Sequence, residues 1–126
     1  MRLASAFALL ACSSPAFATG GIECSPVRGS GPVIHMVIGH GAGPSVVGAW
    51  LIEGNRRLST QEGTAPLAIG QAWIDGQYLW LDLVENDGSR YAARLRARFQ
   101  PRMRGRPAIG TILRNGRSYN LRCVEA

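Results

Sequence analysis

The chain has 126 residues with 14 arginines, no lysine, eight acidic residues and a formal net charge of +6 at pH 7. This length fits one domain with a real hydrophobic core, and no apolar stretch approaches the ~20 residues that a transmembrane helix needs. The three cysteines and two histidines show no Cys-x-x-Cys spacing, so the composition does not favour a zinc site.

The N-terminal segment has the pattern of a secretory signal peptide. Arg2 gives a basic start, residues 3–11 are apolar or small, and Ala-Phe-Ala at 16–18 matches the small-x-small site of signal peptidase. We therefore predict a signal peptide over 1–18 and a single domain over 19–126, which is exported to the periplasm or secreted.

A second interpretation of the same segment concerns Cys12. Leu-Leu-Ala-Cys at 9–12 resembles a lipobox, and lipidation of Cys12 would make the protein an outer-membrane lipoprotein. We favour simple export because the Ala-Phe-Ala site is well formed. Either route leaves Cys24 and Cys123 as the only two thiols in an oxidising compartment, so we predict that they form a disulfide joining the two ends of the domain.

Charge is distributed unevenly along the chain. Residues 19–89 contain three arginines and seven acidic residues, whereas residues 90–126 contain ten arginines and one acidic residue. Such an asymmetry indicates an anionic partner, for example lipid head groups, an acidic polysaccharide or nucleic acid. The alternative is an arginine-rich surface that only keeps the protein in solution, and the sequence favours neither interpretation over the other.

Short β-branched runs bounded by glycine and proline indicate strands over 33–38 and 46–52. The glycine-rich segment between them, 39–45, has glycine where a nucleophile elbow needs serine and lacks the lysine of a phosphate loop, so we interpret it as a hairpin loop. Residues 56–67 are polar and give no clear assignment. Residues 90–99 contain good helix formers, yet their strict alternation of arginine with apolar residues favours a strand.

Two turn signals delimit a predicted strand over 77–85. Asp-Gly at 75–76 precedes it and gives a two-residue loop that sets Trp73 opposite Tyr78. Asn-Asp-Gly at 86–88 follows it, and only a three-residue loop there brings apolar residues together on one face. That loop sets Leu83 opposite Tyr91, Leu81 opposite Ala93 and Leu79 opposite Leu95.

The same register predicts a mixed aromatic and arginine surface on the opposite face of the sheet. It sets Trp80 opposite Arg94 and Tyr78 opposite Arg96. Cross-strand neighbours at these distances touch, and an arginine over an exposed aromatic ring contributes roughly 0.5–1 kcal/mol. A Pro-flanked loop at 100–107 carries three more arginines that could grip phosphate or carboxylate groups. The candidate binding residues are therefore Trp73, Tyr78, Trp80, Arg94, Arg96, Arg98, Arg102, Arg104 and Arg106.

The Asn-Gly pair at 115–116 is a strong signal for a two-residue hairpin near the C-terminus. It places Ile112 opposite Tyr119 and Ala108 opposite Cys123, so the Cys123 side chain points toward the core. Several antiparallel hairpins with joined ends indicate an all-β fold: a small antiparallel barrel or sandwich of about six to eight short strands, closed by one disulfide.

The remaining polar residues do not form a recognisable catalytic or cofactor motif. His35 and His40 have no acidic residue near them in sequence that would complete a metal site. Asp82 and Glu85 are three residues apart on one predicted strand, so they point to opposite faces and cannot flank a scissile bond. We therefore predict a protein that is not an enzyme and that holds neither metal nor cofactor.

These observations predict an exported binding module of the cell envelope that recognises an anionic partner through its aromatic and arginine surface. A protein-interaction or inhibitor domain that uses the same surface is the alternative, and a small hydrolase is the least favoured interpretation. The expected partner is an anionic glycan, a lipid head group or an envelope protein. Nucleic acid is not favoured, because it is scarce in this compartment and the basic loop has no aromatic residue for base stacking.

Overall fold

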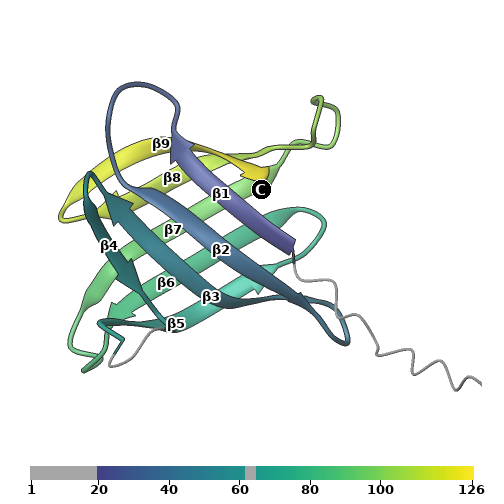
Figure 1. Cartoon of the computed structure of the whole chain (residues 1–126). Coiled ribbons are helices and arrows are strands. Elements are labelled where there is room, and N and C mark those ends of the chain that lie inside the picture. Colours follow the sequence, from purple (N-terminus) through teal and green to yellow (C-terminus); the bar gives the residue numbers. More distant parts are fainter. Residues whose placement is uncertain (1–19, 62–64) are drawn as a thin grey trace, which may run out of the picture.

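The computed structural model describes residues 20–61 and 65–126, and these ranges contain nine β-strands (Figure 1). The predicted signal peptide and Cys12 lie outside the described residues. The same ranges contain no helix, and hence none that could span a membrane. The strands are β1 (Gly20–Pro26), β2 (Val33–His40), β3 (Pro44–Glu53), β4 (Arg56–Ser59), β5 (Leu67–Ile74), β6 (Tyr78–Glu85), β7 (Tyr91–Phe99), β8 (Ala108–Arg114) and β9 (Arg117–Glu125).

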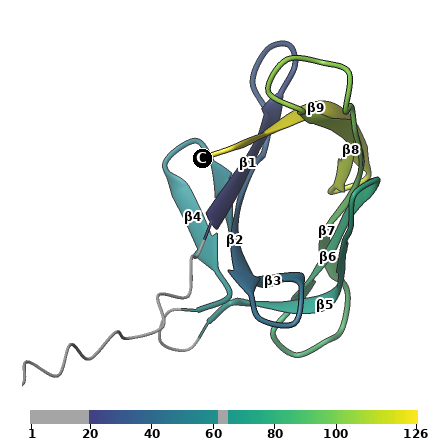
Figure 2. The same cartoon turned by 90° about the vertical axis from the view of Figure 1, so that its right-hand side faces the viewer.

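The strands form one antiparallel sheet that curls into a nearly closed barrel. Their order is β4-β3-β2-β1-β9-β8-β7-β6-β5, so only the β1–β9 pair joins strands that are distant in sequence. Figure 2 shows a ring made of β1 to β3 and β5 to β9, with β4 outside it. β3 packs against β5, but among the described residues no hydrogen-bonded ladder joins them, and the ring therefore has one seam.

This architecture confirms the predicted all-β antiparallel fold, and of the two predicted forms, barrel or sandwich, it is the barrel. It has nine strands where about six to eight were expected. The additional strand is β4, which lies in the polar stretch that gave no clear assignment. β7 is a strand rather than a helix, and from Ala93 to Ala97 its residues alternate between the buried interior and the outer surface. β2 and β3 extend into the glycine-rich segment, which leaves a loop of only 41–43.

A disulfide joins Cys24 on β1 to Cys123 on β9. The two residues lie directly opposite each other in the ladder, and both are buried, with 0% and 1% of their surface exposed. The predicted pairing is confirmed. Among the described strands, β1 and β9 are the one hydrogen-bonded pair that is not consecutive in sequence, and the disulfide cross-links this pair. The disulfide also indicates an oxidising compartment.

The interior of the barrel is filled by the inward-facing side chains of its strands. Three leucines of β6 lie opposite alanine or leucine on β7, and this alternation of large and small side chains lets them interdigitate. The same layer continues across β8, β9, β1, β2 and β3. The largest fully buried apolar side chains are Ile34, Met36, Leu51, Leu79, Leu81, Leu83, Leu95, Ile112 and Leu121.

The C-terminal hairpin between β8 and β9 has the predicted register. Asn115 and Gly116 have φ angles of 52° and 74°, the left-handed values that a two-residue type I′ turn requires at both central positions. The ladder pairs Ile112 with Tyr119, and Ala108 with Cys123. The prediction for this hairpin is confirmed, and it places the Cys123 sulfur in the core.

The predicted register between β6 and β7 was wrong by two residues. The turn contains four residues, 86–89, instead of three, and the Glu85 N–H donates to the Arg90 carbonyl oxygen at 3.0 Å. Ala92 is then an extra residue on β7, opposite the step from Leu83 to Val84. The longer turn and the bulge each shift the pairing by one residue. Because the total shift of two residues is even, the side chains from Ala93 onward keep their predicted faces. The observed pairs are Leu79–Ala97, Trp80–Arg96, Leu81–Leu95, Asp82–Arg94, Leu83–Ala93 and Val84–Tyr91.

The pairing between β5 and β6 also differs from the prediction, because Trp73 lies opposite Trp80 and not opposite Tyr78. The cause is the Asp75 side chain. Its carboxylate accepts hydrogen bonds from the backbone N–H groups of Gln77 and Tyr78, both at 2.7 Å. Asp75 therefore forms the first corner of the turn, and the turn is centred one residue later than the Asp-Gly signal indicated.

Candidate binding surface

The predicted aromatic and arginine residues of the middle strands lie together on the outer surface of β5, β6 and β7. The pairing differs from the prediction, since Trp80 faces Arg96 and Tyr78 faces Arg98. Trp73 and Trp80 lie opposite each other and are 54% and 38% exposed, so both indole rings are accessible to a partner. We call this surface the Arg–aromatic face; it comprises Trp73, Tyr78, Trp80, Arg94, Arg96 and Arg98.

The arginines of this face lie over the rings that oppose them. The Arg96 Cζ atom is 5.5 Å from the centroid of the Trp80 ring, and the Arg98 Cζ atom is 5.8 Å from that of Tyr78. The two rings are themselves neighbours on β6, with centroids 5.6 Å apart and an interplanar angle of 47°. Such cation–π contacts hold each guanidinium against a ring at the outer surface, and among the described residues the Arg98 guanidinium has no carboxylate partner.

Tyr91 also belongs to this side of the barrel, although the sequence analysis predicted that it faces the core. It is 56% exposed, and the Arg94 Cζ atom lies 4.3 Å from its ring centroid. The bulge at Ala92 turns Tyr91 outward, because one extra residue reverses the alternation of the strand. The consecutive alanines 92 and 93 were the sequence signal for this bulge, since two adjacent buried residues interrupt a two-residue period.

Asp82 lies beneath two of the arginines and is only 2% exposed. Its carboxylate accepts hydrogen bonds from Arg96 Nη1 at 2.9 Å, from Arg96 Nη2 at 3.2 Å and from Arg94 Nε at 3.3 Å. Burial raises the pKa of the Asp82 carboxyl, but the hydrogen bonds from Arg96 and Arg94 outweigh this effect and hold the pKa below its ordinary value. Asp82 therefore fixes both guanidinium groups in place and neutralises part of their charge.

Asp75 has a similar effect on Trp73. The Trp73 Nε1–H donates to the Asp75 carboxylate at 2.9 Å, which fixes the exposed indole at the end of β5. The backbone N–H groups of Tyr78 and Gln77, together with this indole, hold the pKa of the Asp75 carboxyl below its ordinary value. The ring is thus positioned before any partner arrives.

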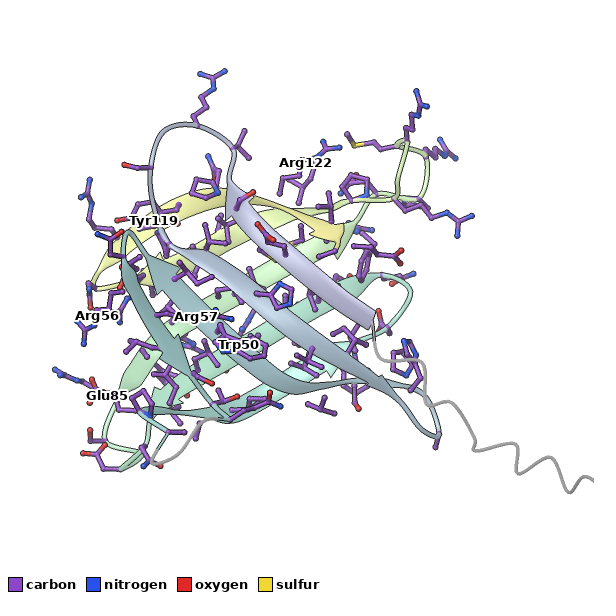
Figure 3. All side chains as sticks on the ribbon, in the orientation of Figure 1. Trp50, Arg56, Arg57, Glu85, Tyr119 and Arg122 are labelled. Carbon is purple, nitrogen blue, oxygen red and sulfur yellow. A yellow bond between two sulfur atoms is a disulfide. The ribbon has the colours of Figure 1, made fainter. Side chains whose placement is uncertain are left out.

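The basic loop, residues 100–107, connects β7 to β8 at the end of the barrel where Tyr78 and Arg98 lie. It is held by backbone hydrogen bonds from Gln100 N–H to the Pro107 carbonyl oxygen at 2.8 Å and from Arg106 N–H to that of Met103 at 3.0 Å. Figure 3 shows its side chains projecting away from the barrel. The predicted residues Arg102, Arg104 and Arg106 are exposed and form no ion pair with any described residue.

The outer surface of β8 extends the Arg–aromatic face with two apolar side chains that sequence reasoning missed. Ile109 lies opposite Arg98 and Leu113 opposite Arg94, and both are more than one-third exposed. The sequence signal was the alternation of β8, since the hairpin register that places Ile112 inward necessarily places these two residues outward. The combined surface is therefore aromatic, basic and partly aliphatic.

A second tryptophan–arginine contact lies on β3 and β4, on the other side of the ring (Figure 2). Figure 3 shows Trp50 and Arg57 close together there, and the Arg57 Cζ atom is 5.1 Å from the Trp50 ring. His35 packs against the same indole with ring centroids 5.6 Å apart. His35 and His40 are not part of a metal site in the described ranges, where no three His, Cys, Asp or Glu side chains gather. This contact provides a matched control for the Arg–aromatic face.

Comparison of the chain with protein-family models, with curated proteins and with solved structures finds no match. The function is therefore argued from the surface itself, because one barrel architecture can support many unrelated functions.

Proposed function

We propose that this protein is an exported, non-enzymatic binding module of the cell envelope that recognises an anionic glycan or lipid head group. The Arg–aromatic face and the basic loop would form its binding surface. The observation that carries the proposal is the row of exposed aromatic rings with arginines held over them on neighbouring strands.

Charge on this surface supports an anionic partner. The face and the basic loop together contain six arginines. Among the described residues, Asp82, which is buried beneath the face, is the one carboxylate that forms ion pairs with them. Arginine presents planar paired donors that match carboxylate and phosphate groups, whereas exposed indole rings offer flat apolar surface to a sugar ring or a lipid interface. A partner that carries an anionic group beside a sugar ring or a lipid interface would contact the arginines and the indole rings together.

Binding to anionic ligands at two salt concentrations tests the proposal. The protein should bind vesicles rich in phosphatidylglycerol or an immobilised sulfated polysaccharide, and affinity should fall about tenfold between 50 and 200 mM salt because the charges are exposed. Neutral phosphatidylcholine vesicles and a neutral glucan serve as controls. Absence of binding to every anionic ligand at 50 mM salt would remove the proposal.

Two matched variants locate the binding surface. Arg98→Gln removes an arginine that lies over Tyr78 on the proposed face, and Arg57→Gln removes one that lies over Trp50 on the other side of the barrel. Both variants lose one exposed charge and one cation–π contact. We expect Arg98→Gln to weaken binding about fivefold and Arg57→Gln to leave it unchanged within about twofold. Equal losses would show that only net charge matters.

An interaction domain that binds one envelope protein is the second candidate. It is favoured by Ile109 and Leu113, which add exposed aliphatic surface beside residue types that dominate protein hot spots. Binding of this kind would be stoichiometric and would change little with salt. Affinity capture from periplasm, repeated with Trp80→Ala, separates the two candidates: one saturable protein partner that is lost in the variant supports the second.

A further inference from the structure

Beyond the packed core, a cavity of about 360 Å³ opens at the end of the barrel where β1 and β3 begin and where β2, β5, β7 and β9 end. We call it the open-end cavity. Ile22, Ile38 and Cys123, which are nearly fully buried, form part of its lining, and Ile74 and Phe99 line it at the ends of β5 and β7. The lining is therefore mostly apolar.

Two of the inward-facing positions at this end are small. Gly20 lies opposite Ile38 and Pro44 lies opposite His40, and neither has a side chain long enough to reach the centre of the barrel. A Cβ atom added to Gly20 would meet only His40 Nε2, at 3.9 Å, which shows that the space beside this residue is unoccupied by other side chains.

The opposite end of the barrel is closed by a charged plug. Arg114 points inward from β8, and its guanidinium donates to Glu53 Oε1 at 2.8 and 3.2 Å and to the Ala92 carbonyl oxygen at 2.9 Å. Only 12% of the Arg114 side chain is exposed. The lining at that end, which includes Arg56, Glu85 and Arg90, is mostly polar, whereas the open-end cavity has the apolar lining that small barrels offer to a single ligand.

The polar residues of the open-end cavity are His40, Arg106 and Glu125. Arg106 comes from the basic loop and has a φ of 46°, a left-handed conformation that is unusual for arginine. Neither it nor its loop neighbours Arg102 and Arg104 pairs with a described carboxylate. Within the lining, Glu125 contributes one negative charge and Arg106 one positive charge, and Arg102 and Arg104 add positive charge on the same loop just outside the lining.

We propose that the open-end cavity binds a medium-chain aliphatic carboxylate, with the chain in the apolar interior and the carboxylate at Arg106. One water molecule occupies roughly 30 Å³ in the liquid, so 360 Å³ holds about a dozen non-hydrogen atoms, the size of decanoate. An unpaired arginine beside an apolar cavity matches a ligand with one anionic end. This site shares Arg106 of the basic loop with the proposed binding surface but includes no residue of the Arg–aromatic face.

Calorimetric titration of the purified protein with decanoate below its micellar concentration tests this proposal. Decanoate should bind at one site per chain, whereas decylamine, which is cationic, should bind at least tenfold more weakly. Chemical shift changes in the ¹H–¹⁵N spectrum should be centred on Gly20, Gly21, Ile38 and Phe99. No saturable binding up to 1 mM decanoate, or equal binding of decylamine, overturns the proposal.

Variants connect the binding to the cavity. Gly20→Trp places an indole in the open space beside His40 and should abolish decanoate binding. Arg106→Gln should weaken decanoate about tenfold and leave decanol unaffected, whereas Arg104→Gln on the same loop should change neither. Trp80→Ala should also leave decanoate binding unchanged, which separates this site from the Arg–aromatic face. If Gly20→Trp fails to fold, the ¹H–¹⁵N shift changes and the Arg106 and Arg104 variants decide where decanoate binds. A decanoate site on the outer surface would refute the proposal.

Discussion

Removal of the Cys24–Cys123 disulfide should cost this barrel a large part of its stability. The bond joins residues that are 99 positions apart in sequence, on the two strands whose pairing joins the β1–β4 half of the sheet to the β5–β9 half. We consider the variants Cys24→Ser, Cys123→Ser and the double variant. Each of them leaves the two strands to find each other across almost the entire chain.

The expected magnitude follows from the length of the closed loop. Cross-linking a loop of about 100 residues lowers the entropy of the unfolded chain by the equivalent of about 4.7 kcal/mol, and measured losses in small secreted domains are about 2–5 kcal/mol. We therefore expect the free energy of unfolding to fall by about 3–5 kcal/mol, against a typical total of about 5–15 kcal/mol. The corresponding decrease in melting temperature is about 15–30 °C for a domain of this size.

Urea unfolding followed by tryptophan fluorescence measures these losses. Because each single variant already breaks the bond, both should lie within about 1 kcal/mol of the double variant, and reduced wild type should behave like them. Peptide mapping of the protein purified without reductant should show the 24–123 bond. Two free thiols in that protein, or a loss of stability below about 1 kcal/mol, would show that the bond does not join the two halves of the sheet as described.

Three other changes test the packing of the barrel. Gly110→Ala should destabilise the fold by about 2–3 kcal/mol or more in the same urea assay, because the added Cβ would overlap the backbone of β7 at Arg96. The control Gly41→Ala adds a Cβ in open space and should change stability by less than about 0.5 kcal/mol. The stability contributed by Asp82, whose pKa is lowered on folding, should be complete above the ordinary carboxyl pKa of about 3.9 and should be lost as pH falls through its lower value in the folded state. Asp82→Asn should therefore flatten the acid limb of the stability–pH profile, and an unchanged limb would contradict the described contacts. Arg114→Ala should destabilise the barrel by about 1–3 kcal/mol in thermal melts, because it leaves the half-buried Glu53 without its partner.

The candidate surface shows why strand faces are easier to predict than strand partners. The alternation of arginine with apolar residues assigned Arg94, Arg96 and Arg98 to the outer face, and they lie there. Their partners were predicted two residues away from the observed ones, because a shift of two residues leaves the alternation unchanged. Tyr91 was assigned to the wrong face because the bulge at Ala92 depends on how β7 meets β6.

The sequence by itself determined features that depend on a few neighbouring residues or on a count of residues. Asn115-Gly116 fixed one hairpin register, because few residue pairs adopt two successive left-handed conformations, and the count of available cysteines left one possible disulfide. The tertiary structure decided everything that depends on distant segments meeting. The seam between β3 and β5, the plug of Arg114 on Glu53 and the open-end cavity all arise where strand ends from distant parts of the chain converge. No local pattern encodes that convergence, because the curvature of the whole sheet determines which strand ends meet.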